Sequence, residues 1–168
     1  MDKNIILIGM MGSGKTTVGR LLAQSLRRPF LDTDALIEER EGRSIPDIFA
    51  QDGEDAFRAL ELELSRELSS SRGLVIACGG GLPLRKEAIS ALKQNGLVFW
   101  LDRDPVETYD SLNVFRRPLA RSGRDDFIRR YQGRVPIYRK WSDHIIRAKS
   151  PRDAEALIVD ICSEVSEP

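Results

Sequence analysis

The sequence predicts an α/β fold in which five parallel strands form one sheet with helices on both faces. Short apolar runs alternate with helical patterns along the whole chain, as they do in proteins built from a parallel sheet and crossover helices. Residues 4–9 are almost continuously aliphatic, which is typical of a strand buried on both faces. No linker, repeat or low-complexity segment divides the 168 residues. We therefore expect a single domain over residues 1–168.

The first half of the chain supplies two strands and four helical segments. After the strand at 4–9, residues 15–27 carry apolar residues at helical spacing. Residues 29–32 form the second strand, and a short helix at 35–41 ends at Gly42. Ser44 is the expected cap of another short helix, with Pro46 near its start. The helix after Gly53 has an apolar stripe consisting of Phe57, Leu60, Leu64 and Leu68.

The second half supplies three strands and four helical segments. Residues 74–77 form the third strand, and a helix is expected at 83–94. The fourth strand, at 97–101, is followed by a helix that opens at Asp104 and Pro105. Residues 111–123 are rich in arginine and lack a clear period, whereas residues 124–139 are helical again. A short strand at 144–146 and a helix at 152–164 complete the pattern.

Composition limits the setting in which the protein works. A formal net charge of zero gives no electrostatic reason to expect a nucleic-acid partner. Cys78 and Cys162 show no paired spacing and there is no secretory signal pattern, so we expect a reducing, cytoplasmic location. The apolar runs are shorter than a membrane span, so no membrane association is expected.

A phosphate-binding loop follows the first strand. The segment GMMGSGKTTVG, residues 9–19, has the spacing G-x-x-x-x-G-K-T between a strand and a helix. Backbone N–H groups of such a loop and the positive end of the helix hold phosphates, the lysine reaches the outer phosphates, and the hydroxyl after it binds Mg²⁺. The predicted ATP-binding residues are Gly12, Ser13, Gly14, Lys15, Thr16 and Thr17. The loop alone leaves kinase, ATPase, GTPase and switch proteins open.

Two carboxylates end the second strand. Asp32 and Asp34 are two residues apart, so in an extended segment they point to the same side, toward the edge where parallel sheets bind ligands. One suits the Mg²⁺ shell, and Asp32 is the better metal candidate because the third strand ends without an aspartate. The other can accept a proton from an attacking hydroxyl. The alternative is that Asp34 only caps the helix after it.

Arginines and glycines provide further candidates. Arg58 lies one turn before Glu61, which would orient its guanidinium, although a simple surface ion pair is the alternative. The arginine-rich loop before Gly123 is of the kind that forms a mobile lid. Gly79, Gly80 and Gly81 end the third strand and either let the backbone approach a ligand closely or simply separate strand from helix.

Taken together, these residues resemble the shikimate kinase family over nearly the whole chain. The matching pieces, in order, are residues 9–17, Leu31-Asp32-Thr33-Asp34, residues 53–61, Gly79-Gly80-Gly81, Arg117-Pro118-Leu119 and Arg134-Val135-Pro136-Ile137-Tyr138. The resemblance implies a three-layer α/β/α P-loop kinase with a five-stranded parallel sheet. It also implies a lid at about 112–124 and a substrate-binding helical region at about 35–60.

The resemblance also implies a reaction and a role for each candidate residue. ATP would phosphorylate shikimate to shikimate 3-phosphate, with Thr16 and Asp32 serving Mg²⁺. Asp34 would bind the shikimate hydroxyls and act as base. Catalysis would also use Lys15 and Arg117, the latter a lid residue touching the transferring phosphate. The shikimate-binding residues would be Asp34, Arg58, Gly79, Gly80, Gly81 and Arg134. We expect a monomer acting on the small molecules shikimate and ATP.

Two other classes of function stay open at this point. A different small-molecule kinase, for gluconate or a nucleoside monophosphate, would share the phosphate loop. The pair Asp32 and Asp34, together with residues 53–61, favours shikimate. A non-catalytic nucleotide-binding module is the other alternative, and the presence of both aspartates, Lys15, Arg58 and Arg134 argues against it.

Overall fold

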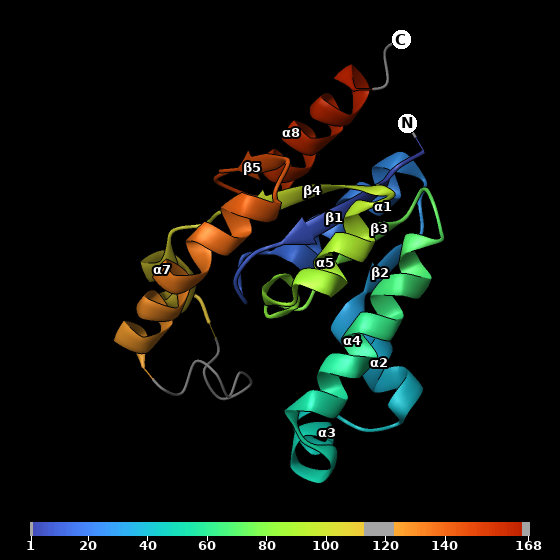
Figure 1. Cartoon of the computed structure of the whole chain (residues 1–168). Coiled ribbons are helices and arrows are strands. Elements are labelled where there is room, and N and C mark those ends of the chain that lie inside the picture. The colour runs from blue at the N-terminus through green and yellow to red at the C-terminus, as the bar shows by residue number, and fades with distance from the viewer. Residues whose placement is uncertain (1, 113–122, 166–168) are drawn as a thin grey trace.

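A computed structural model describes residues 2–112 and 123–165 of the chain. Figure 1 shows its strands and helices, coloured along the chain. The elements are β1 (Asn4–Ile8), α1 (Lys15–Leu26), β2 (Phe30–Asp32), α2 (Thr33–Glu41), α3 (Ile45–Asp52), α4 (Glu54–Ser69), β3 (Val75–Ala77), the 3₁₀ turn η1 (Leu82–Leu84), α5 (Lys86–Lys93), β4 (Gly96–Leu101), α6 (Pro105–Asp110), α7 (Arg124–Trp141), β5 (His144–Ile146) and α8 (Pro151–Glu164).

The five strands form one parallel sheet in the order β2-β3-β1-β4-β5. Strand β1 lies at its centre and is buried along its whole length. In register, Leu7 pairs with Ala77 of β3 and with Phe99 of β4. The carboxyl ends of these strands therefore meet at one edge, where ligands of open α/β sheets bind. The predicted parallel sheet of five strands is confirmed.

Alternate residues of β1 face two separate apolar cores. Ile5 and Leu7 pack with residues of α1 and α8, whereas Ile6 and Ile8 pack with residues of α3, α4, α5 and α7. This alternation follows from the two-residue period of a strand. Helices thus cover both faces, and the predicted three layers are confirmed. Figure 1 shows α2, α3 and α4 extending from the side of the sheet that ends in β2.

Three helix boundaries differ from the sequence prediction. Helix α2 begins at Thr33 rather than at residue 35, because Asp32 caps it. The expected helix at 83–94 is divided into η1 and α5 by Arg85, whose backbone is extended. Helix α7 continues to Trp141. The cap predicted at Ser44, the helix start predicted at Asp104 and Pro105, and the stop at Gly42 are confirmed.

Part of the predicted lid at 112–124 lies outside the described residues, and Arg117 is in that part. Its predicted contact with the transferring phosphate therefore stays a prediction from the sequence. Within 2–112 and 123–165, no helix combines the length and the apolar character needed to cross a bilayer.

Candidate active site

The phosphate loop connects β1 to α1 and leaves backbone N–H groups for a ligand. Gly12 and Gly14 have φ angles of 79° and 95°, which is the left-handed region where glycine is favoured. No side chain caps α1 at Gly14. The first N–H groups of the helix and the positive end of its dipole are therefore available to an anion.

Lys15 lies against this loop. Its Nζ donates to the carbonyl oxygens of Gly9 and Met10, each at 2.8 Å. These contacts hold the ammonium over the mouth of the loop. A cation there lies beside the N–H groups that would hold phosphates, as the sequence predicts.

Asp32 uses its two carboxylate oxygens differently. Oδ2 accepts a hydrogen bond of 3.0 Å from Oγ1 of Thr16. Oδ1 accepts from the backbone N–H groups of Asp34 and Ala35, so Asp32 is the N-cap of α2. The alternative in which Asp34 caps this helix is therefore wrong. The hydroxyl and Oδ2 together offer two oxygen ligands at the start of α1.

Asp34 lies in the first turn of α2 and lines the cleft. Burial raises the pKa of its carboxyl to about 6, and the negative charges of Asp32 and Glu61 add to the increase while Lys15 opposes it. A carboxylate with a raised pKa is a stronger base than an exposed aspartate. The tertiary structure thus supplies the environment that a base requires.

Each glycine of the triple glycine lies against one charged side chain. A methyl group on Gly79 would overlap the carboxylate of Asp34. A methyl group on Gly80 would lie 3.4 Å from Nη1 of Arg134, and one on Gly81 would lie 3.3 Å from Nη1 of Arg58. The glycines therefore let three charged side chains approach the backbone closely. A glycine segment that only separated the strand from the next helix would not need these contacts.

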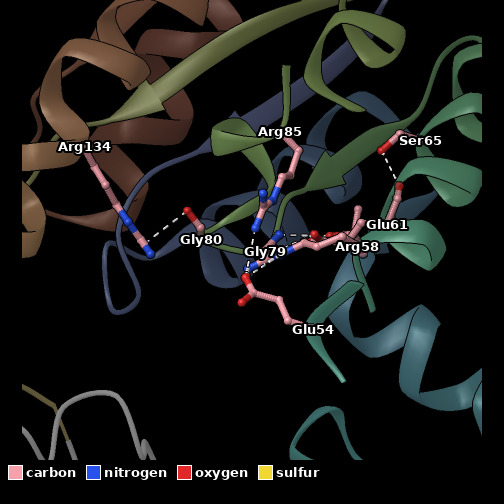
Figure 2. Close-up of polar contacts among 9 residues, drawn as sticks. Glu54, Arg58, Glu61, Ser65, Gly79, Gly80, Arg85 and Arg134 are labelled. Carbon is pink, nitrogen blue, oxygen red and sulfur yellow. Dashed lines mark hydrogen bonds and ion pairs between the residues drawn. The ribbon is translucent and has the colours of Figure 1, made fainter. Parts of the chain in front are cut away.

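Arg58 is held by two glutamates of its own helix, as Figure 2 shows. Its Nη1 donates to Oε2 of Glu61 at 2.6 Å, and Nε and Nη2 contact Oε1 of Glu54 at 3.4 and 3.3 Å. The Glu61 side chain is only 1% exposed. Burial raises the pKa of Glu61, and its hydrogen bond from Arg58 opposes the increase. This is a mostly buried pair, so the alternative of an ordinary surface ion pair is wrong.

Arg134 approaches the triple glycine from α7. Its Nη1 donates to the carbonyl oxygen of Gly80 at 3.3 Å, a contact drawn in Figure 2. The hydroxyl of Tyr138, one turn later, donates to the same oxygen at 2.9 Å. Both groups also contact Sδ of Met10. Helix α7 is thereby tied to the phosphate loop and to the third strand.

The main cleft at this edge of the sheet has a volume of about 770 Å³. Its lining includes most of the predicted site residues, namely Gly12, Gly14, Lys15, Thr16, Thr17, Asp32, Asp34, Gly79 and Gly80. Ser13, Gly14, Lys149 and Pro151 are among the residues that line a smaller hollow of about 120 Å³ beside the loop. Thus one large and one small space flank the phosphate loop.

Sequence reasoning missed four residues of the site. Thr33 is fully buried, and its Oγ1 accepts a hydrogen bond from the N–H of Gly79 at 2.9 Å. Arg103 lines the cleft and donates to the carbonyl of Gly12. Met10 contacts Nη1 of Arg134, and Tyr138 donates to the same Gly80 carbonyl oxygen as Arg134 does. Met10, Thr33 and Tyr138 lie within the matching segments, whereas Arg103 had no signal because its contact with Gly12 joins distant parts of the chain.

The chain is similar to known shikimate kinases in sequence and in fold. The family model described as shikimate kinase matches residues 11–165. A shikimate kinase of Symbiobacterium thermophilum is 44% identical over 164 residues, which cover 96% of this chain and 87% of the relative. A solved shikimate kinase of Acinetobacter baumannii, in complex with shikimate, superposes with a TM-score of 0.91 at 34% identity, covering 100% of this chain and 97% of that one. A gluconokinase of Sinorhizobium meliloti has a TM-score of 0.60 at 16% identity over 98% of this chain and 95% of that one, so it shares the fold alone.

Proposed function

The chain belongs to the shikimate kinase family, and we propose that the cleft described above is where it carries out the family's reaction. The protein is a phosphotransferase that uses ATP to phosphorylate the 3-hydroxyl of shikimate, a step of chorismate and aromatic amino acid biosynthesis. The observation that most strongly supports the location is the triple glycine, which meets the predicted base and both predicted carboxylate-binding arginines.

The phosphate loop and Lys15 would hold ATP. The backbone N–H groups of the loop and of the first turn of α1 suit the phosphate oxygens. The Lys15 ammonium already lies over the loop through its contacts with Gly9 and Met10. As phosphates arrive, it would exchange these carbonyl oxygens for phosphate oxygens and neutralise the charge that moves to the leaving ADP. The base of ATP would occupy the small hollow that Lys149 and Pro151 help to line.

The oxygen donors of Thr16 and Asp32 fit Mg²⁺. This ion takes oxygen ligands and is usually held by one or two protein groups plus phosphates and water. Oγ1 of Thr16 and Oδ2 of Asp32 lie 3.0 Å apart beside the loop. Bound there, Mg²⁺ would neutralise phosphate charge during transfer.

Asp34 would receive the acceptor hydroxyl. With a pKa of about 6, its carboxyl is mostly ionised at neutral pH and still basic enough to accept the proton that the hydroxyl loses. The backbone at Gly79 lies against this carboxylate, so a ring bound over the triple glycine would place a hydroxyl near Asp34. The chemistry then needs positioning and charge neutralisation rather than a covalent intermediate on the protein.

Arg58 and Arg134 would bind the carboxylate of shikimate. They reach Gly81 and Gly80 from different helices, α4 and α7. Guanidinium groups bind carboxylates through two parallel hydrogen bonds. An acceptor that carries both hydroxyls and one carboxylate matches a site with a base at one end and two guanidinium groups at the other.

We also propose the setting in which this enzyme works. Residues 1–168 act as one domain, since a single sheet joins the strands from β2 to β5. A monomeric, cytoplasmic enzyme without a nucleic-acid partner fits the zero net charge and the two buried cysteines, neither of which forms a disulfide. Size measurement in solution together with chemical cross-linking tests the monomer.

A coupled assay of ADP release tests the proposed function. The protein with Mg²⁺ and ATP is given shikimate, gluconate, a nucleoside monophosphate or no acceptor. We expect turnover with shikimate and little in the other three reactions. Turnover of gluconate without turnover of shikimate would contradict the proposal, and ATP binding without any acceptor-dependent turnover would indicate a non-catalytic module.

A further inference from the structure

Arg85 does not line the cleft, nor does Arg58, and the two are connected through a single carboxylate oxygen. Its Nη2 contacts Oε1 of Glu54 at 2.9 Å. The same oxygen accepts from Nε and Nη2 of Arg58 at 3.4 and 3.3 Å. Figure 2 shows Glu54 between the two guanidinium groups. Oε1 of Glu54 therefore joins Arg85 to the side chain assigned to the acceptor's carboxylate.

We propose that Arg85 is a positioning residue for the acceptor's carboxylate, which acts on Arg58 through Glu54. The inference rests on the assignment of Arg58 under the proposed function. Arg85 does not touch the acceptor in this role. It keeps the Glu54 carboxylate beside Nε and Nη2 of Arg58.

The two glutamates that hold Arg58 differ in their freedom. Glu61 is almost fully buried, so packing keeps its carboxylate beside Nη1 of Arg58. The Glu54 side chain is 55% exposed, and an exposed glutamate samples several rotamers. Without a second partner it would hold Arg58 only part of the time. Arg85 is the partner that keeps it in place.

The chain places Arg85 there through a short turn. Gly81 lies against Nη1 of Arg58, and the 3₁₀ turn η1 then carries the chain to Arg85, four residues later. Glu54 and Arg58 are four residues apart and share one face of α4. One short segment therefore contacts two successive turns of α4. The extended backbone of Arg85, which divides η1 from α5, belongs to this arrangement.

The orientation of Arg58 matters because two-pronged binding of a carboxylate is directional. A guanidinium that rotates away loses one of two parallel hydrogen bonds. The substrate affinity then falls, whereas the nucleotide and the transferring phosphate are unaffected. A loss of Arg85 should therefore change the shikimate KM and leave both kcat and the ATP KM close to the wild-type values.

A double-mutant cycle on the full-length enzyme tests this role. We expect Arg85→Gln to raise the shikimate KM about two- to fivefold, the effect of losing an exposed ion pair. Arg85→Lys should restore most of the affinity. In a Glu54→Gln background, Arg85→Gln should change the shikimate KM by less than about twofold, because the connecting carboxylate is already gone.

Glu67→Gln, which breaks an ion pair of similar exposure, is the matched control. Arg40 contacts Glu67 at 2.7 Å, and the two side chains are 45% and 55% exposed, close to the 44% and 55% of Arg85 and Glu54. This pair does not contact Arg58, so the shikimate KM should not change. An unchanged KM in Arg85→Gln, or equal increases with and without Glu54, would overturn the inference. If the wild-type protein did not phosphorylate shikimate, the proposed function itself would fail.

Discussion

Thr16 donates a hydrogen bond to one oxygen of Asp32, while the other oxygen of Asp32 caps α2. The first residue belongs to the phosphate loop and the second to the next strand of the chain. This one carboxylate thus joins the nucleotide half of the site to the helix that carries Asp34. The position of the base therefore depends on the group assigned to Mg²⁺.

Asp32→Asn should separate these two roles. Asparagine caps helices about as well as aspartate, so we expect the melting temperature to change little. The lost charge should raise the Mg²⁺ concentration needed for half-maximal activity about tenfold or more. Asp104→Asn is the control, because Asp104 caps α6 through the same kind of contacts. An equal Mg²⁺ requirement in both variants would remove Asp32 from the metal site.

Asp34→Asn should abolish most turnover while ATP still binds. The amide cannot take the proton of the acceptor hydroxyl, so we expect kcat to fall about a hundredfold or more. Steady-state assays with shikimate and a direct ATP-binding measurement check this. Near-normal kcat would show that Asp34 orients the hydroxyl without accepting its proton.

The same variant should be more stable than the wild type at neutral pH. The folded-state pKa of Asp34 is about 6 against an ordinary 3.8, so the folded state binds this proton more tightly than the unfolded state. The contribution of Asp34 to the free energy of unfolding therefore falls as pH rises from about 4 to 6, by about 1–3 kcal/mol. Asp34→Asn should gain that amount at pH 7 and almost nothing at pH 4. Denaturant unfolding at both pH values checks it; an equal difference at both would contradict the raised pKa.

Gly79→Ala should impair catalysis without preventing folding. The added methyl group would displace the Asp34 carboxylate, and we expect kcat to fall about tenfold or more because a small misplacement of a reacting group is costly. Gly133→Ala is the control, since a methyl group there meets no atom within 4 Å. That helical position should become slightly more stable. Equal kcat values in the two variants would show that catalysis does not require the close packing of Gly79 against Asp34.

Arg134→Ala should raise the shikimate KM about tenfold or more, since it removes a charged hydrogen-bonding group from the acceptor site. The ATP KM should change far less. Tyr138→Phe removes the neighbouring hydrogen bond to Gly80 but keeps the guanidinium. It should instead lower the free energy of unfolding by about 1 kcal/mol. A shikimate KM that does not change in Arg134→Ala would show that the carboxylate binds elsewhere.

Local patterns were sufficient for much of this protein. The alternation of apolar runs and helical segments predicted the parallel sheet and its two helical layers, because each element must bury its own apolar face. The spacing of the phosphate loop predicted the nucleotide site, since that geometry is formed within a few consecutive residues. Ser44 was identifiable as a cap for the same local reason.

Tertiary structure decided which groups meet and how they behave. The pKa of Asp34 depends on burial and on Glu61, which lies on another helix. The three glycines acquire their partners from α2, α4 and α7. The link from Arg85 through Glu54 to Arg58 crosses from the junction of η1 and α5 to α4. Sequence by itself determined the elements and the candidate residues. Packing between distant segments decided the raised pKa of Asp34, the orientation of Arg58 and the contacts of Arg134, because burial and through-space charge have no local signature.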